Sequence, residues 1–126
     1  MPLALGTDIV EIRRLEEAIR KHGESFLQRF LTPEEIKAGQ TRGAAFLAYC
    51  AGRWAAKEAV SKMLGTGLGA KCSFQDIIIR NNPAGAPEVI LQGNAAQTAK
   101  VSGIGTILIS ISHEQHYCVA TVIGSE

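Results

Sequence analysis

The sequence predicts an α+β domain in which a mostly antiparallel sheet packs on one long central helix. The Ala-rich run 43–64 has the length, composition and periodicity of a long helix. Strand-like runs rich in β-branched residues come in pairs with short connections, as in antiparallel hairpins. A chain of 126 residues has room for one domain, 1–126, and is too short for two ordinary ones.

The first third of the chain predicts one strand and two short helices. Residues 3–12 are rich in aliphatic and β-branched side chains, as in a strand, and Asp8 is the only early charge. Residues 13–23 carry a narrow apolar stripe typical of a surface helix. In LTPEEI, Thr32 can cap a helix and Glu35 can complete a capping box, so another short helix begins there.

After the central helix, the glycine-rich segment 65–71 ends the helical pattern. Turn-forming residues at 81–86 and a short connection at 114–116 each separate two strand-like runs, which predicts two hairpins. The elements expected are strands at 74–80 and 87–92, a short helix at 93–103, and strands at 106–113 and 117–123.

The composition excludes several classes of protein. With 46% hydrophobic and 20% charged residues the chain has the balance of a globular protein, and a net charge of +1 argues against a strongly basic nucleic-acid binder. No apolar run reaches the roughly 18 residues of a membrane span. Asp8 and Glu11 come too early for a signal peptide, and three cysteines without CxxC spacing indicate reduced thiols. We therefore expect a cytoplasmic protein.

Three charged residues are the main candidates for chemistry. Glu58 and Lys62 share the arc of the central helix that carries Trp54, which the spacing assigns to the packed side, and Asp8 lies in an apolar strand. Two carboxylates that converge suit Mg²⁺, and Lys62 could then meet phosphate oxygens. The alternatives are an i,i+4 ion pair between Glu58 and Lys62 and an exposed or turn position for Asp8.

The other candidate features are weaker. The segment 65–71 could cradle a phosphate, but it lacks the GxxxxGK[ST] spacing and fits a helix stop better. The run from His113 to His116 lacks the spacing of a zinc site, although His113 at a strand end could contact an anion. The basic residues of 13–23 indicate either a solvated helix face or a docking surface for an acidic protein.

Taken together, the motifs resemble the holo-[acyl-carrier-protein] synthases of the phosphopantetheinyl transferase superfamily. The similarity covers nearly the whole chain: GTDIVEI, FLTPEEI, RWAAKEAVSKMLGTGL, FQDIII, PEVIL and SISH. The most specific part is the pattern W-x-x-K-E-A-x-x-K from Trp54 to Lys62, combined with an early G-T-D.

The resemblance implies an activity, a metal and two substrates. Members of this family transfer 4′-phosphopantetheine from coenzyme A to a serine of apo acyl carrier protein in an Mg²⁺-dependent reaction. The reaction releases adenosine 3′,5′-bisphosphate and supports fatty acid biosynthesis. The short bacterial class forms homotrimers with active sites between subunits, so we expect the same assembly here.

The resemblance also assigns roles to individual residues. Asp8 and Glu58 match the Mg²⁺ ligands, and Lys62 matches the lysine beside the pyrophosphate; Glu58 is the candidate base for the serine hydroxyl. The remaining expected contacts are Arg53, Gly65, Pro87 and His113 to coenzyme A, and Arg14 and Lys21 to the carrier protein.

Two other functions remain compatible with the residues alone. One is a non-catalytic module whose basic helix recruits an acidic partner and whose Glu58–Lys62 pair is structural. The other is a different Mg²⁺-dependent phosphate enzyme that uses the same carboxylates. Replacement of Glu58 by Gln separates these, because only an enzyme that uses Glu58 would lose activity and keep its fold.

Overall fold

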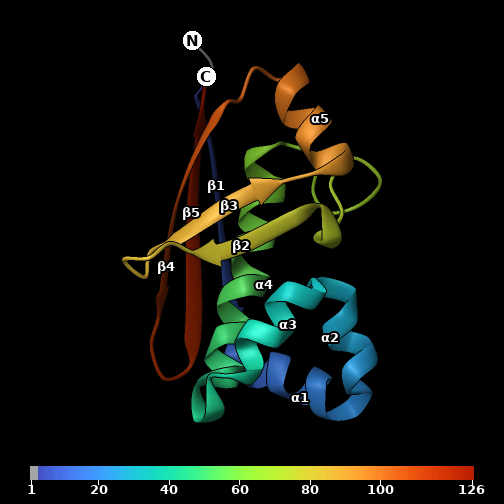
Figure 1. Cartoon of the computed structure of the whole chain (residues 1–126), viewed down its shortest axis with the longest axis vertical. Helices are drawn as coiled ribbons and strands as arrows, with labels where there is room; N and C mark the ends of the chain where they lie inside the picture. The colour runs from blue at the N-terminus through green and yellow to red at the C-terminus, as the bar shows by residue number, and fades with distance from the viewer. Residues whose placement is uncertain (1–2) are drawn as a thin grey trace.

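A computed structural model describes residues 3–126 and shows the predicted α+β architecture (Figure 1). In chain order the elements are β1 (Leu3–Glu11), α1 (Ile12–His22), α2 (Glu24–Phe30), α3 (Pro33–Gln40), the 3₁₀ turn η1 (Gly43–Ala45), α4 (Phe46–Met63), the 3₁₀ turn η2 (Phe74–Asp76), β2 (Ile77–Asn81), β3 (Pro87–Leu91), α5 (Gly93–Val101), β4 (Thr106–His113) and β5 (Tyr117–Ser125).

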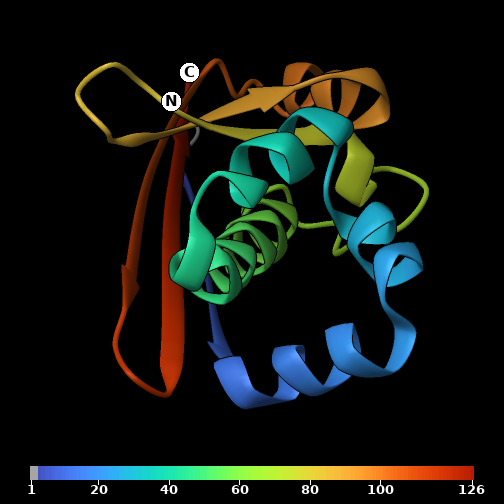
Figure 2. The same cartoon turned by 60° about the horizontal axis from the view of Figure 1, so that its bottom comes forward.

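The main sheet is antiparallel in the order β1–β5–β4, so the last strand lies between the other two. Its side chains alternate between a buried and an open face, as the two-residue period of a strand requires. On β5, Cys118, Ala120 and Val122 are buried, whereas Thr121 and Ile123 are exposed. The buried face packs on α4, and in Figure 2 the helices all lie on that side of the sheet.

Helix α4 crosses the middle of the molecule and is covered on most of its circumference. The main sheet lies on one side of it, the β2–β3 hairpin on another, and α1 closes a third (Figure 2). The helix begins at Phe46, three residues later than predicted, because 43–45 form a 3₁₀ turn. One prediction about α4 is wrong: the arc with Trp54, Glu58 and Lys62 is its open side, since Trp54 and Glu58 are only partly buried and Lys62 is exposed.

The two predicted hairpins are confirmed. β2 pairs with β3, and β4 pairs with β5, both antiparallel. The strand expected from residue 74 begins only at Ile77, because Ser73 caps a 3₁₀ turn over 74–76 by accepting a hydrogen bond from the Asp76 N–H. The predicted capping box at Thr32 and Glu35 is also present.

The sequence patterns missed helix α2. It has seven residues, follows Gly23 and has no side-chain cap, so its own propensity is low. Its stability comes from tertiary packing, because Phe26 and Phe30 join Trp54 of α4 and Phe74 of η2 in one aromatic cluster with ring centroids 5.0 to 6.2 Å apart.

The three cysteines are buried free thiols. Among the helices of residues 3–126, none has the length and hydropathy needed to cross a membrane.

Candidate active site

Asp8 faces α4 because a glycine two residues earlier lets β1 lie directly against that helix. A Cβ atom at Gly6 would stand 2.0 Å from the carbonyl oxygen of Ala59 and 2.6 Å from the N of Met63, so no other residue fits there without movement. Residues two apart on a strand share a face, and Asp8 therefore points toward the same helix. Lys62 Nζ donates a hydrogen bond to Asp8 Oδ1 over 2.9 Å.

Glu58 lies in the same pocket as Asp8. A cavity of about 490 Å³ is lined by both carboxylates, by Arg14 and by an apolar wall that includes Phe26 and Trp54. Burial, and then the negative charge of Asp8, raise the pKa of the Glu58 carboxyl, and the Lys62 ammonium opposes this only in part. Within residues 3–126 the ion pair of Lys62 is with Asp8, not with Glu58, so the i,i+4 alternative does not hold.

The two carboxylates fit a divalent cation. They come from different elements and line one pocket, and the negative charge of Asp8 disfavours the charged form of Glu58, an effect that a bound cation would offset. Mg²⁺ commonly uses one or two protein carboxylates and completes its shell with water and phosphate oxygens. No cluster of three or more His, Cys, Asp or Glu side chains that could hold a metal ion occurs in the described part of the chain.

A second pocket brings together three of the four residues expected to contact coenzyme A. Arg53, Pro87 and His113 line a cavity of about 260 Å³, together with Arg42 and Asn81. The cavity therefore combines two guanidinium groups and an imidazole at the meeting point of α4, the β2–β3 turn and the end of β4.

Arg53 is held firmly at this pocket. Its side chain is 7% exposed, its guanidinium carbon lies 4.3 Å from the centroid of the Tyr49 ring, and Nη2 donates to Asn81 Oδ1 over 3.1 Å. Its Nε is buried and has no hydrogen-bond partner among residues 3–126. A buried donor without a partner is costly, so this atom is suited to an anionic ligand.

Gly65, the fourth residue expected to contact coenzyme A, lies outside this pocket. It follows the end of α4 with a φ of +78°, a conformation that glycine adopts without strain, and its N–H donates to the carbonyl of Lys62. It is therefore near the Lys62 end of α4 and does not line the Arg53 pocket.

The two predicted carrier-protein contacts are the arginine and the lysine of α1 that have no ion pair within residues 3–126. Arg13 pairs with Glu17 and Arg20 with Glu16, whereas Arg14 and Lys21 are exposed. Arg14 also lines the pocket of Asp8 and Glu58, so this helix borders the carboxylate pair.

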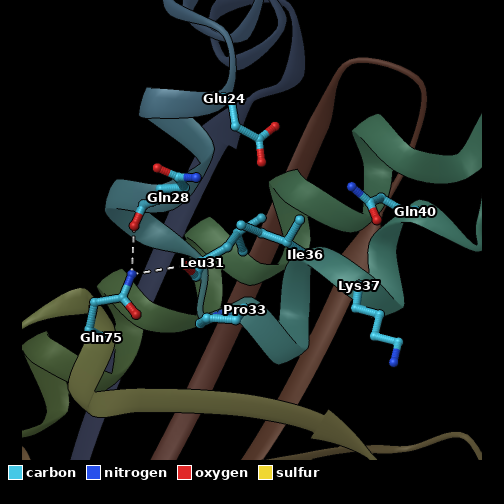
Figure 3. A pocket seen from close by; sticks show the side chains of 8 residues that line it. All are labelled: Glu24, Gln28, Leu31, Pro33, Ile36, Lys37, Gln40 and Gln75. Carbon is cyan, nitrogen blue, oxygen red and sulfur yellow. Dashed lines mark hydrogen bonds between the residues drawn. The ribbon is translucent and has the colours of Figure 1, made fainter.

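The sequence analysis missed several residues at these pockets. Arg42 and Asn81 lie in segments with turn composition, Tyr49 has no polar pattern around it, and Phe26 belongs to the helix that was not predicted. A larger cavity of about 690 Å³ lies between α2 and α3, where the Gln75 amide donates to the carbonyls of Gln28 and Leu31 (Figure 3). It contains none of the predicted site residues.

Comparison with known proteins decides the family. The sequence profile of the 4′-phosphopantetheinyl transferase superfamily matches residues 4–122. The chain is 45% identical over 122 residues to the holo-[acyl-carrier-protein] synthase of Vibrio parahaemolyticus, with 96% of this chain and 95% of the relative covered. The chain belongs to the holo-[acyl-carrier-protein] synthases of this superfamily. The family and the synthase activity expected from the motifs are thereby confirmed.

Solved structures of holo-[acyl-carrier-protein] synthases share the fold. The enzyme from Neisseria meningitidis superposes with a TM-score of 0.91 at 34% identity, covering 98% of both chains. The Helicobacter pylori synthase, solved in complex with coenzyme A, gives a TM-score of 0.84 at 36% identity over 96% of this chain and 99% of its own. A Bacillus anthracis synthase, with a TM-score of 0.81, 35% identity and coverage of 98% and 96%, was solved in complex with CoA (3′,5′-ADP).

Proposed function

We propose that this synthase transfers 4′-phosphopantetheine from coenzyme A to a serine of apo acyl carrier protein, with Mg²⁺ held by Asp8 and Glu58. The observation that carries the proposal is the meeting of Asp8, Glu58 and Lys62 at the junction of β1 and α4. Mg²⁺ bound there would neutralise negative charge on the phosphate oxygens of the transferred group.

Glu58 is our candidate for the proton acceptor. In the reaction the serine oxygen forms a bond to the β-phosphorus of coenzyme A, and the bond from that phosphorus to the oxygen of the departing adenosine 3′,5′-bisphosphate breaks. The serine proton must leave, and the carboxylate of Glu58 lines the pocket in which it can accept that proton, directly or through a metal-bound water.

Lys62 supplies positive charge for the phosphates. Its side chain is 51% exposed, so its ion pair with Asp8 is only weakly stabilising and the ammonium can turn toward a ligand. A flexible ammonium beside the leaving phosphate stabilises the charge that develops on it.

We further propose that Arg53, Pro87, His113 and Gly65 bind the nucleotide and pantetheine parts of coenzyme A. The buried guanidinium of Arg53 would meet the 3′-phosphate, with His113 beside it. On a helix that turns about 100° per residue, Arg53 and Glu58 point roughly 140° apart. One coenzyme A molecule therefore reaches both groups most easily when they come from neighbouring subunits.

The open face of the sheet supports a homotrimer with shared sites. Leu5, Ile123 and Leu108 are neighbours across the three strands, and they are 65%, 40% and 64% exposed. Leu3 and Ile9 extend this apolar row. Contiguous apolar surface of this kind is typical of protein interfaces. We propose that each 1–126 chain is one domain of a cytoplasmic trimer.

Arg14 and Lys21 are our proposed contacts for the carrier protein. They are the arginine and the lysine of α1 without an ion pair in the described residues, and Arg14 borders the carboxylate pocket. An acidic partner docked on this helix would bring its serine close to Glu58, and complementary charge would speed the encounter.

The deciding experiment is an intact-mass assay of apo acyl carrier protein with coenzyme A, Mg²⁺ and this protein, run beside an EDTA control. We expect the carrier protein to gain one phosphopantetheine only when metal is present. Glu58→Gln should abolish the gain without changing the circular dichroism spectrum, whereas Glu88→Gln, the same change at an exposed strand position, should not. Transfer that persists in EDTA or in Glu58→Gln would refute the assigned roles.

A further inference from the structure

The most deeply buried charges of the protein lie outside both pockets. Glu35 of α3 and Lys57 of α4 are 1% and 0% exposed, and their side chains form an ion pair of 2.6 Å. Neither side chain lines the carboxylate pocket or the Arg53 pocket. Replacing a buried ion pair by apolar side chains often leaves stability unchanged or improves it, so stability alone is a weak explanation for this one.

The carboxylate of Glu35 connects three parts of the fold. Oε1 accepts hydrogen bonds from the N–H of Thr32 and from Lys57 Nζ, and Oε2 accepts one from the N–H of Ile79 in β2. Lys57 Nζ also donates to the carbonyl of Phe74. The Glu35 carboxylate is thus tied to two main-chain N–H groups, and the Lys57 ammonium is held between this carboxylate and a main-chain carbonyl.

Fixing Lys57 also fixes the direction of the next residue, Glu58. The two side chains leave α4 about 100° apart, one toward Glu35 and the other into the carboxylate pocket. The contacts of Lys57 oppose rotation of α4 about its axis at this position, and they thereby favour the direction of Glu58 into the pocket of Asp8.

The main chain of Glu35 supports the second pocket. Its carbonyl accepts a hydrogen bond of 2.7 Å from the hydroxyl of Tyr49, whose ring lies beneath the Arg53 guanidinium. The ring also packs closely on Gly39, where a Cβ atom would stand 2.8 Å from Cδ1 and Cε1 of Tyr49. The ring is thus held in place, and with it the apolar surface on which Arg53 rests.

We infer that Glu35 is a shared positioning residue of the transferase: its carboxylate holds Glu58 in place through Lys57, and its carbonyl holds Arg53 in place through Tyr49. This inference rests on the proposed function, since it concerns the groups that would bind the metal and the nucleotide. It predicts that metal affinity and nucleotide affinity can be lost separately, because the carboxylate and the carbonyl of Glu35 act on different pockets.

The first test concerns Lys57→Met, which removes the ammonium and keeps a side chain of similar length. We expect the affinity for Mn²⁺, used as a spectroscopic probe and measured by electron paramagnetic resonance, to fall about 10-fold or more, as when other groups that orient metal ligands are removed. The affinity for adenosine 3′,5′-bisphosphate, measured by calorimetry without metal, should stay unchanged. If the unpaired Glu35 prevents folding, the double variant Glu35→Gln with Lys57→Met removes both charges and should show the same split.

The second test concerns Tyr49→Phe, which removes only the hydroxyl that Glu35 holds. We expect the affinity for adenosine 3′,5′-bisphosphate to fall about fivefold, the value of one ordinary hydrogen bond, and Mn²⁺ binding to be unchanged. The control is Ile104→Val, a change in a buried side chain beyond α5 that loses stability without touching Glu35, Lys57 or Tyr49. Both affinities should match the wild type in this variant when it is fully folded.

Each outcome has a definite meaning. Lys57 and Tyr49 variants that bind both probes as well as Ile104→Val does would show that Glu35 serves stability only, and would overturn the inference. Variants that weaken both probes equally would also overturn it, since the two supports would not be separate. Wild-type protein that binds neither probe would refute the proposed function, and the inference with it.

Discussion

The replacement Gly6→Ala tests whether the close approach of β1 to α4 creates the active site. The added methyl group would lie 2.0 Å from the Ala59 carbonyl oxygen, whereas real Cβ atoms essentially never come within 3.0 Å of such an atom. The strand and helix must therefore separate by about 1 Å, and the obstacle is backbone, which cannot turn aside as a side chain can.

This displacement should affect both stability and activity. Overpacking in a core typically costs 1–3 kcal/mol, and we expect about 3 kcal/mol here because the clash is with main-chain atoms, so the melting temperature should drop by roughly 10 °C. Because Asp8 is two residues from Gly6, the same shift moves it away from Glu58 and Lys62. A displacement of 1 Å can lower a rate about 100-fold.

The assay is thermal unfolding followed by turnover at a temperature where the variant remains folded. The matched control is Gly69→Ala, where the new Cβ would meet nothing within 4 Å and the change should leave both the melting temperature and turnover unchanged. A Gly6→Ala protein with wild-type stability and turnover would refute the reasoning, because it would show that the tight contact is not needed to align Asp8.

Three further predictions concern docking, pH and assembly. Arg14→Glu should raise the KM for carrier protein far more than the KM for coenzyme A, whereas Arg13→Glu should have the smaller effect; equal changes in both KM values would exclude α1 as the docking face. In metal-free protein the raised pKa of Glu58 makes the folded state bind this proton more tightly than the unfolded chain does. The free energy of unfolding should therefore fall as the pH rises from 4.5 through the raised pKa, and Glu58→Gln should lack this fall in urea titrations; parallel pH curves would contradict the shift. Ile123→Lys should dissociate the proposed trimer in sedimentation, and mixing Glu58→Gln with Arg53→Ala subunits should restore activity; mixtures without activity would argue against shared sites.

The sequence predicted elements with strong local signals and missed those that depend on distant contacts. The hairpins, the capping box at Thr32 and the central helix follow from turn residues, capping and periodicity, and all are present. Helix α2 was missed because its seven residues are held by an aromatic cluster with α4 and η2. No local pattern reports such contacts.

In the candidate site, too, the sequence predicted the residues with local signals but not the contacts between distant segments. The residue types and motif spacing pointed to Asp8, Glu58 and Lys62, but the contact between Asp8 and Lys62 spans 54 positions and depends on a glycine whose importance is visible only in three dimensions. Periodicity also assigned Glu58 and Lys62 to the packed side of α4. That assignment failed because α4 is buried on nearly every side, so these two candidate residues lie on its least covered arc and not on its most apolar one.

The run Lys57–Glu58–Ala59 shows how one turn of helix joins the fold to the site. Successive residues point about 100° apart, so the three face different neighbours: Lys57 contacts Glu35, Glu58 lines the carboxylate pocket, and the backbone of Ala59 meets Gly6. Because a helix turn is rigid, a displacement at the contact of Lys57 or of Ala59 also displaces Glu58. Gly6→Ala and Lys57→Met disturb opposite sides of α4, yet both should weaken metal binding and slow turnover without loss of nucleotide affinity. If both variants lose metal affinity and keep nucleotide affinity, general destabilisation does not explain the result, because it would also weaken the Arg53 pocket.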